Sequence, residues 1–129
     1  MQLNEQQRAF LDEVHYAVVG TLNRDGSIQQ TVVWFVREGD ELRFSLGASS
    51  VKLQNLRRNP TITLTVEDGA RYLSLSGSAA VEPADQELRK RLAQRYLGAE
   101  RAAEWITQSP NVERSSVRIT VQRAYGQGV

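Results

Sequence analysis

The sequence predicts a mainly β protein with added helices, an α+β chain in which about six antiparallel strands form a small closed barrel. The first observation is a series of apolar segments between residues 16 and 47, joined by the hairpin signals Asp25-Gly26 and Glu38-Gly39-Asp40. The second is the alternation of polar and apolar residues from 61 to 82, which turns near Gly69. Hairpins in place of helical crossovers argue against a parallel sheet, and 129 residues suit a single domain, residues 1–129.

The first half of the chain gives two short helices and five strands. Asn4 can cap a helix that begins at Glu5, and residues 16–47 then give three strands. A second helix is expected to begin near Ser49 or Ser50 and to end before Pro60. The segments "TITLTVED" and "RYLSLSGSAAVE" alternate at every second residue and predict two further strands.

From residue 83 the pattern becomes helical. Leu88, Leu92 and Tyr96 follow helical spacing, and Gly98 is a stop signal. The segment "AERAAEWITQ" predicts another short helix, in which Trp105 is expected to serve packing, and "SSVRITVQRAYG" predicts the last strand. The arginines of the helical region are expected to form a solvated face; they are Arg89, Arg91, Arg95 and Arg101.

Composition excludes several kinds of site. The chain has no cysteine and one histidine, which excludes disulfides, thiol catalysis and a multi-histidine zinc site, so we predict no metal. A net charge of +1 gives no strong field for nucleic acid, and none is expected as a partner. No apolar run approaches the ~18 residues of a membrane span, and the polar start lacks a signal-peptide core. We therefore expect a cytoplasmic protein without a membrane partner.

The second helix combines small hydroxyl residues with cations. Its first N–H groups have no partner within the helix, and a serine at this end can cap one of them. The same N–H groups, Ser50 and the ammonium of Lys52 can instead bind an anion. Arg57 and Arg58 lie in the last turn, where cations suit the helix dipole. From the residues alone, a plain helix cap and an anion site both remain open.

At this point the chain resembles a known family. The pattern S-x-K-x-x-N-L-x-x-x-P, the segment "GARYLSLSGSAAV" and the ending "VRITVQRAYG" are similar to the split-barrel flavin and deazaflavin oxidoreductases. This superfamily includes the pyridoxamine-phosphate oxidases, and the match is nearest to the actinobacterial branch that uses coenzyme F420, including members that reduce biliverdin. The resemblance covers roughly Tyr16 to Gly126. It implies a six-stranded antiparallel split β-barrel of the FMN-binding type.

The resemblance also implies a homodimer with cofactor sites at its interface. The cofactor ring is expected against the second and third strands and the phosphate at the start of the second helix. Arg57 and Arg58 would extend the basic surface toward an acidic tail, and Tyr72 would reach in from the second subunit. The implied cofactor-binding residues are Gln29, Thr31, Val33, Trp34, Ser45, Ser50, Lys52, Asn55, Arg57 and Tyr72.

The implied activity is hydride transfer from reduced F420 to a conjugated small-molecule acceptor, for which a biliverdin-like molecule is one candidate. FMN is the alternative cofactor, in a pyridoxamine-phosphate-oxidase-like enzyme. Such oxidases carry basic residues where Val51 and Trp34 stand, which weakens that alternative. A carrier of flavin or tetrapyrrole without turnover is a further alternative. No side chain is predicted as a catalytic acid or base, and Trp34 suits either the core or the ring pocket.

Overall fold

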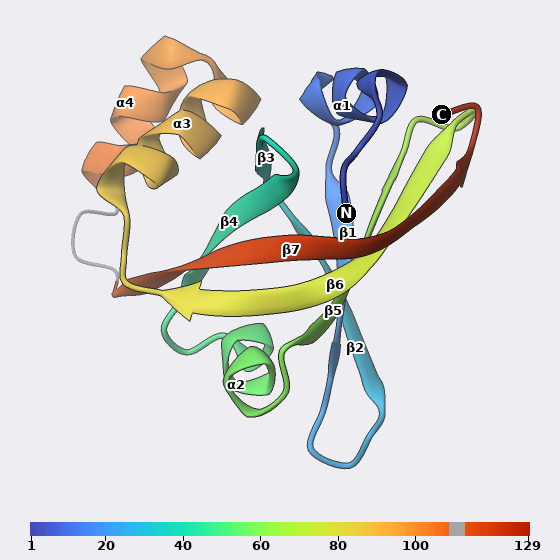
Figure 1. The fold of residues 1–129 in the computed structure, drawn as a ribbon. Helices are drawn as coiled ribbons and strands as arrows, with labels where there is room; N and C mark the ends of the chain where they lie inside the picture. Colours follow the sequence, from blue (N-terminus) through green and yellow to red (C-terminus); the bar gives the residue numbers. More distant parts are fainter. Residues whose placement is uncertain (109–112) are drawn as a thin grey trace.

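The computed structural model describes residues 1–108 and 113–129, which form four helices and seven strands (Figure 1). The helices are α1 (Glu5–Asp12), α2 (Val51–Arg58), α3 (Gln86–Leu97) and α4 (Ala99–Gln108). The strands are β1 (Ala17–Leu22), β2 (Ile28–Val33), β3 (Val36–Glu38), β4 (Glu41–Gly47), β5 (Thr61–Glu67), β6 (Tyr72–Glu82) and β7 (Arg114–Gln127). The mainly β class with helices is therefore confirmed.

The strands form one antiparallel sheet in the order β2-β1-β5-β6-β7-β4-β3. Its two edge strands, β2 and β3, are consecutive in the chain and are joined only by Trp34 and Phe35. The sheet therefore curls until its edges approach each other at this link. No β2–β3 pairing is found in the described part of the chain, so the sheet is a curled half-barrel rather than the closed barrel that we expected.

The predicted strand count is one too low. Residues 16–47 contain four strands, because the chain leaves the sheet at Trp34 and Phe35 and resumes as the short strand β3. Both hairpins on either side of this break lie where the turn signals placed them: β1 pairs with β2, and β3 pairs with β4. The break separates the two edges of the half-barrel and leaves Trp34 outside both strands.

The core fills the inside of the curl. Along β5 and β6 the apolar residues point inward while threonine and serine point outward, as the alternation predicted. Three phenylalanines are fully buried with them, Phe10 from α1, Phe35 from the link and Phe44 from β4. The long strands β6 and β7 pair along most of their length and hold the half-barrel together, as Figure 1 shows.

Helix α1 lies across one end of the half-barrel (Figure 1). Asn4 caps it as predicted, because its side chain accepts from the backbone N–H of Gln7 while the Gln7 side chain accepts from the Asn4 N–H. At the other end, Arg95 of α3 donates to the backbone carbonyls of Leu11 and Glu13 at 3.0 and 2.8 Å. Arg95 thus stabilises the helix C-terminus and links α1 to the α3–α4 hairpin.

The prediction of a solvated arginine face on the helical hairpin is wrong for Arg89 and holds only in part for Arg91 and Arg95, which are partly exposed. Arg95 binds the carbonyls at the end of α1, Arg91 pairs with Glu38, and Arg89 is only 5% exposed. Arg101 is exposed as expected. The hairpin packs closely beside β3 and β4, so part of the face expected to meet water instead meets protein. No helix in the described residues is long and apolar enough to cross a membrane.

Candidate functional site

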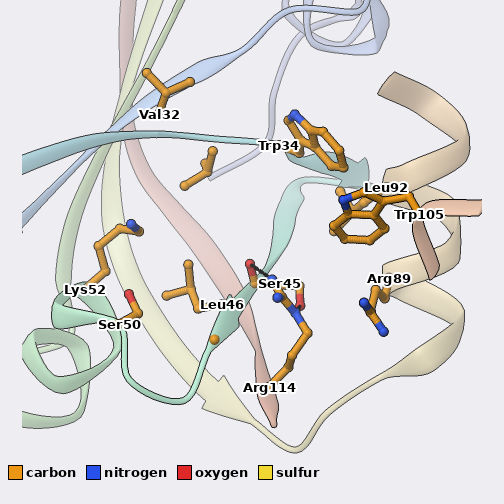
Figure 2. A pocket seen from close by; sticks show the side chains of 12 residues that line it. Val32, Trp34, Ser45, Leu46, Ser50, Lys52, Arg89, Leu92, Trp105 and Arg114 are labelled. Carbon is orange, nitrogen blue, oxygen red and sulfur yellow. Dashed lines mark hydrogen bonds between the residues drawn. The ribbon is translucent and has the colours of Figure 1, made fainter. Parts of the chain in front are cut away.

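A cavity of about 390 Å³ lies where β2, β4, the start of α2 and the α3–α4 hairpin come together (Figure 2). Its walls therefore combine residues that lie far apart in the sequence. The residues that line it are Val32, Val33, Trp34, Ser45, Leu46, Gly47, Ser50, Lys52, Arg89, Leu92, Trp105 and Arg114. None of these described residues is acidic, whereas Lys52, Arg89 and Arg114 are basic. The cavity therefore favours an anionic ligand.

One end of the cavity is formed by the first turn of α2. Ser50 occupies the N-cap position, but its hydroxyl makes no capping hydrogen bond, so the plain capping role is wrong. Lys52 is half-buried and forms no hydrogen bond or ion pair with any described residue, and burial lowers the pKa of its ammonium. A hydroxyl and an ammonium without partners, next to a helix N-terminus, suit a phosphate or carboxylate.

The other end of the cavity holds the guanidinium of Arg114, at the start of β7. Its Nε donates to the Ser45 hydroxyl at 2.8 Å, and its Nη2 donates to the Ser45 carbonyl at 3.1 Å. Arg89 lies nearby on α3, with its guanidinium carbon 4.8 Å from the centre of the Trp105 ring. Burial, and secondarily the charge of Arg89, lower the pKa of Arg114. Two cations thus share a partly dry environment.

An aromatic wall lies between the sheet and the helical hairpin. Trp34 stacks on Tyr96 with ring centres 5.2 Å apart and planes 9° apart, and it lies 5.5 Å from the tilted ring of Trp105. The Tyr96 hydroxyl donates to the His15 carbonyl at 2.7 Å, which fixes the stack. Trp34 is therefore both a packing residue and a wall of the cavity. Trp105, which was expected only to pack its helix, also borders the cavity.

Two further residues on the inner face of β2 adjoin the cavity residue Val33 but do not line the cavity themselves. Gln29, Thr31 and Val33 alternate on this face, and Val33 lines the cavity. The Gln29 Oε1 and the Thr31 Oγ1 are buried and have no hydrogen-bond partner among the described residues. Buried polar atoms are nearly always paired in a protein, so these two atoms suit a ligand with hydrogen-bonding groups at its edge. A planar flavin-like ring is such a ligand.

The structure brings together five of the ten residues that the resemblance implied: Val33, Trp34, Ser45, Ser50 and Lys52. Gln29 and Thr31 adjoin them on β2. The other three do not line the cavity. Arg57 is exposed on α2, Tyr72 is partly exposed on the opposite part of the sheet, and Asn55 is buried.

Asn55 is placed in a structural network rather than at the cavity. Its Nδ2 donates to the Thr21 hydroxyl at 3.1 Å and to the Asn23 Oδ1 at 2.9 Å, and its Oδ1 accepts from Arg58 at 3.0 Å. With 3% of its surface exposed, the side chain has its hydrogen-bonding groups satisfied by protein. Its role in this structure is to tie α2 to the β1–β2 hairpin.

Sequence reasoning missed the second cationic end of the cavity. Arg89 and Leu92 are three residues apart on the same helical stripe as Tyr96, a spacing that could have identified Arg89 as inward-facing. Arg114 offered no such signal, because it begins a strand and meets Ser45 only through the β4–β7 pairing.

A separate cluster of Glu13, His15 and Asp68 places possible metal-ligating atoms within 4.8 Å of one another. Arg71 donates to both carboxylates of this cluster. Hydrogen bonds from the backbone and guanidinium of Arg71 lower the pKa of Asp68 to about 2. The guanidinium of Arg71 already pairs with both carboxylates, and we assign no metal to the cluster.

The curled antiparallel sheet, with a basic cavity at the start of α2 and an aromatic wall, defines the split-barrel class of small oxidoreductases. The model of the pyridoxamine 5'-phosphate oxidase family matches residues 3–128. The chain belongs to this family, as the resemblance predicted.

The chain is similar over nearly its whole length to one protein of known activity and to two solved structures. The chain is 32% identical over 130 residues to the F420H(2)-dependent biliverdin reductase of Mycobacterium tuberculosis (strain CDC 1551 / Oshkosh), covering 97% of this chain and 88% of that protein. It matches the crystal structure of the conserved hypothetical protein Rv2991 from Mycobacterium tuberculosis with a TM-score of 0.78 and 26% identity, over 96% of this chain and 84% of that one. It shares the fold of a structure named F420 reductase, with a TM-score of 0.75 and 22% identity, over 95% and 98% of the two chains.

Proposed function

We propose that this protein is an F420-dependent reductase that transfers a hydride to a conjugated small-molecule acceptor such as biliverdin. The observation that carries the proposal is the cavity, in which Ser50 and the unpaired Lys52 at the start of α2 share a lining with Trp34 and Trp105. Two unpartnered polar atoms lie buried on the adjoining strand β2. The similarity to an F420H(2)-dependent biliverdin reductase supports this choice of cofactor and acceptor.

The residues of the cavity suit the parts of such a cofactor. Ser50 and Lys52 would hold its phosphate, because they combine a hydroxyl, an ammonium and a helix N-terminus. Ser45, which the resemblance also implied for the phosphate, instead accepts from Arg114 at the other end of the cavity. Gln29 and Thr31 would meet the polar edge of the ring, since the Gln29 Oε1 can accept from a ring N–H. Val33 and Trp34 would supply the apolar surface against which the ring packs.

The residues present also favour F420 over FMN. Pyridoxamine-phosphate oxidases, as the resemblance implies, add basic residues at the positions of Val51 and Trp34. Val51 is exposed and Trp34 belongs to the aromatic wall, so neither supplies a cation to a phosphate. A phosphate diester, as in F420, carries less charge than the monoester of FMN and needs fewer cations.

When bound, reduced F420 would supply a hydride to an electrophilic carbon of the acceptor, and solvent would supply the accompanying proton. The protein binds, orients and shields these partners. None of the described lining residues is an aspartate, glutamate, histidine or tyrosine, which supports solvent as the source of that proton. The stacked rings of Trp34 and Tyr96 and the tilted ring of Trp105 would shield one side from water.

We also propose a homodimer of single-domain subunits. The outer face of β1 and β2 exposes three apolar residues, Val18, Ile28 and Val32, and Val18 and Val32 lie opposite each other in the sheet. Val32 belongs to this face and also borders the cavity. A second subunit seated on this face would therefore complete the cavity wall, and Tyr72 of β6 would be available to contact the partner's site.

The test is a titration of the purified protein with F420 and with FMN, followed by anaerobic mixing with reduced F420 and biliverdin. We expect tighter binding of F420, and oxidation of reduced F420 that depends on both the protein and the acceptor. If FMN binds more tightly than F420, FMN is the cofactor. Binding of F420 without acceptor-dependent oxidation, across biliverdin and other conjugated acceptors, would make the protein a carrier.

A further inference from the structure

We propose that Arg114 and Arg89 form a second anion subsite, which binds a carboxylate of the acceptor beside the rings of Trp34 and Trp105. This inference rests on the proposed function and names the chemistry of its substrate. Figure 2 shows two separate cationic groups: Ser50 and Lys52 on the α2 side of the cavity, and Arg114 with Arg89 on the side of the helical hairpin. A ligand phosphate bound at α2 would leave Arg114 without an anion.

The guanidinium of Arg114 is held in a fixed orientation and keeps one nitrogen available for an anion. Two of its nitrogens donate to Ser45, which fixes the plane of the guanidinium, whereas Nη1 has no hydrogen-bond partner within the described ranges. The side chain is half-buried, and this burial lowers the pKa of Arg114. No acidic residue among those described pairs with it. A fixed, partly dry guanidinium is the side chain that best binds a carboxylate.

Arg89 adds a second positive charge close to the first. It is buried against the face of Trp105 and contributes to the lowered pKa of Arg114. Two neighbouring cations in a partly dry site raise the free energy of the unliganded protein, and an anion between them lowers it. Arg43, which is buried to a similar extent, shows the usual arrangement, because Glu38, Glu82 and Asp85 surround it. None of the described residues that line the cavity is acidic, so an anionic ligand would supply the charge partner that Arg114 lacks among them.

The surroundings of the arginines indicate a planar, largely apolar molecule that carries the carboxylate. Trp34, Trp105, Leu92 and Leu46 form the remaining wall at this end of the cavity. A conjugated acceptor with carboxylate side chains, as biliverdin has, combines both features. The glutamate tail of F420 carries the same carboxylate chemistry, so the experiment must separate the acceptor from the cofactor.

The two tryptophans of the chain, Trp34 and Trp105, both line the cavity, so their fluorescence reports ligand binding without turnover. We would titrate the cofactor-free protein with biliverdin and with its dimethyl ester, which keeps the rings and removes both charges. Arg114→Gln and Arg89→Gln should each weaken biliverdin binding by about ten- to a hundredfold and leave ester binding unchanged. Arg101→Gln, on the exposed face of the same hairpin, is the matched control and should bind both ligands normally. Thermal melts establish that each variant is folded.

With reduced F420 present, KM for biliverdin should rise in both variants while kcat stays close to wild type, since the carboxylate contact is the same before and during hydride transfer. Unchanged biliverdin binding in both folded variants, or equal affinity of wild type for acid and ester, would overturn the subsite. Loss of F420 affinity in place of biliverdin affinity would reassign the arginines to the cofactor tail. Wild type that binds biliverdin through these arginines but never oxidises reduced F420 would refute the proposed function and keep the subsite.

Discussion

At the scale of single residues, Lys52 carries a charge that its own helix does not stabilise, because the first turn of α2 lies at the positive end of the helix dipole. We expect Lys52→Ala to raise the Kd for F420 about ten- to a hundredfold, the effect of losing one charge-assisted contact. The free energy of unfolding of the cofactor-free protein should stay the same or rise slightly. Calorimetric titration and urea denaturation measure the two quantities.

The chain offers one matched control, since Lys52 and Lys90 are its only lysines. Lys90 is exposed on α3 and away from the cavity, so Lys90→Ala should leave F420 affinity unchanged. Added salt should weaken binding by wild type more than binding by Lys52→Ala. If Lys52→Ala binds F420 as tightly as wild type, the phosphate binds elsewhere.

The lowered pKa of Lys52 gives a second test, in the cofactor-free protein. Because burial lowers this pKa below its unfolded value of 10.5, the unfolded chain binds more protons in the interval between the two values. The free energy of unfolding therefore rises with pH across that interval, because the unfolded chain holds the proton more tightly than the folded protein does. The free energy of unfolding of wild type should increase relative to Lys52→Ala as pH approaches 10.5. A constant difference between the two proteins would contradict the burial of the ammonium.

Asn55 matches the family pattern, but in this structure its contacts are to protein. Asn55→Ala removes the donor to Thr21 and Asn23 and the acceptor for Arg58. We expect the free energy of unfolding to fall by about 1–3 kcal/mol, measured by urea denaturation. Arg57→Ala, on the exposed side of the same helix, should change it by no more than about 0.5 kcal/mol. If Asn55→Ala keeps the full free energy of unfolding but loses affinity for F420, Asn55 belongs to the cofactor site.

At the scale of elements, the pairing of β6 with β7 determines the shape of the half-barrel. The register shifts between Ser76 and Gly77, where a bulge bends the strand, and a Cβ at Gly77 would overlap the backbone carbonyl of Thr120. Gly77→Ala should therefore lower the free energy of unfolding by about 1–3 kcal/mol or more, measured by urea denaturation. Gly47→Ala, where a Cβ meets nothing within 4 Å, is the control. Equal stability of the two variants would show that the bulge can relax.

Elements with local signals could be predicted from the sequence, and elements set by distant contacts could not. The alternation in β5 and β6, the Asn4 cap and the start of α2 all depend on neighbouring residues, and the structure has them where the sequence placed them. The break at Trp34 and Phe35 is different, because it follows from the curl of the whole sheet. Arg114 escaped prediction for the same reason, since only the β4–β7 pairing brings it to Ser45.

At the scale of the whole molecule, the cavity depends on the order in which the sheet is assembled. Its two sides, β2 and β4, lie near opposite ends of the strand order, and they meet only because the sheet curls. The α3–α4 hairpin then covers the gap, anchored by Asp85, which caps α3 and accepts from Arg43 of β4 at 3.1 Å. The helical hairpin thus contributes Arg89 and Trp105 to the site while it protects one edge of the sheet.

The other edge of the sheet is strand β2, and the outer face of β1 and β2 is the surface on which we propose that a second subunit binds. We expect a dimer at micromolar concentration by sedimentation velocity, with an interface of at least ~2,000 Å² in total.

Ile28→Glu places a charge on an exposed apolar residue of β2 that does not line the cavity, so it should shift the protein toward monomer. Val14→Glu, at a similarly exposed residue outside the sheet, should leave the dimer intact. Because Val32 joins this face to the cavity, the Ile28→Glu monomer should also bind F420 more weakly than wild type. A wild-type monomer with full F420 affinity would contradict both the dimer and the shared site.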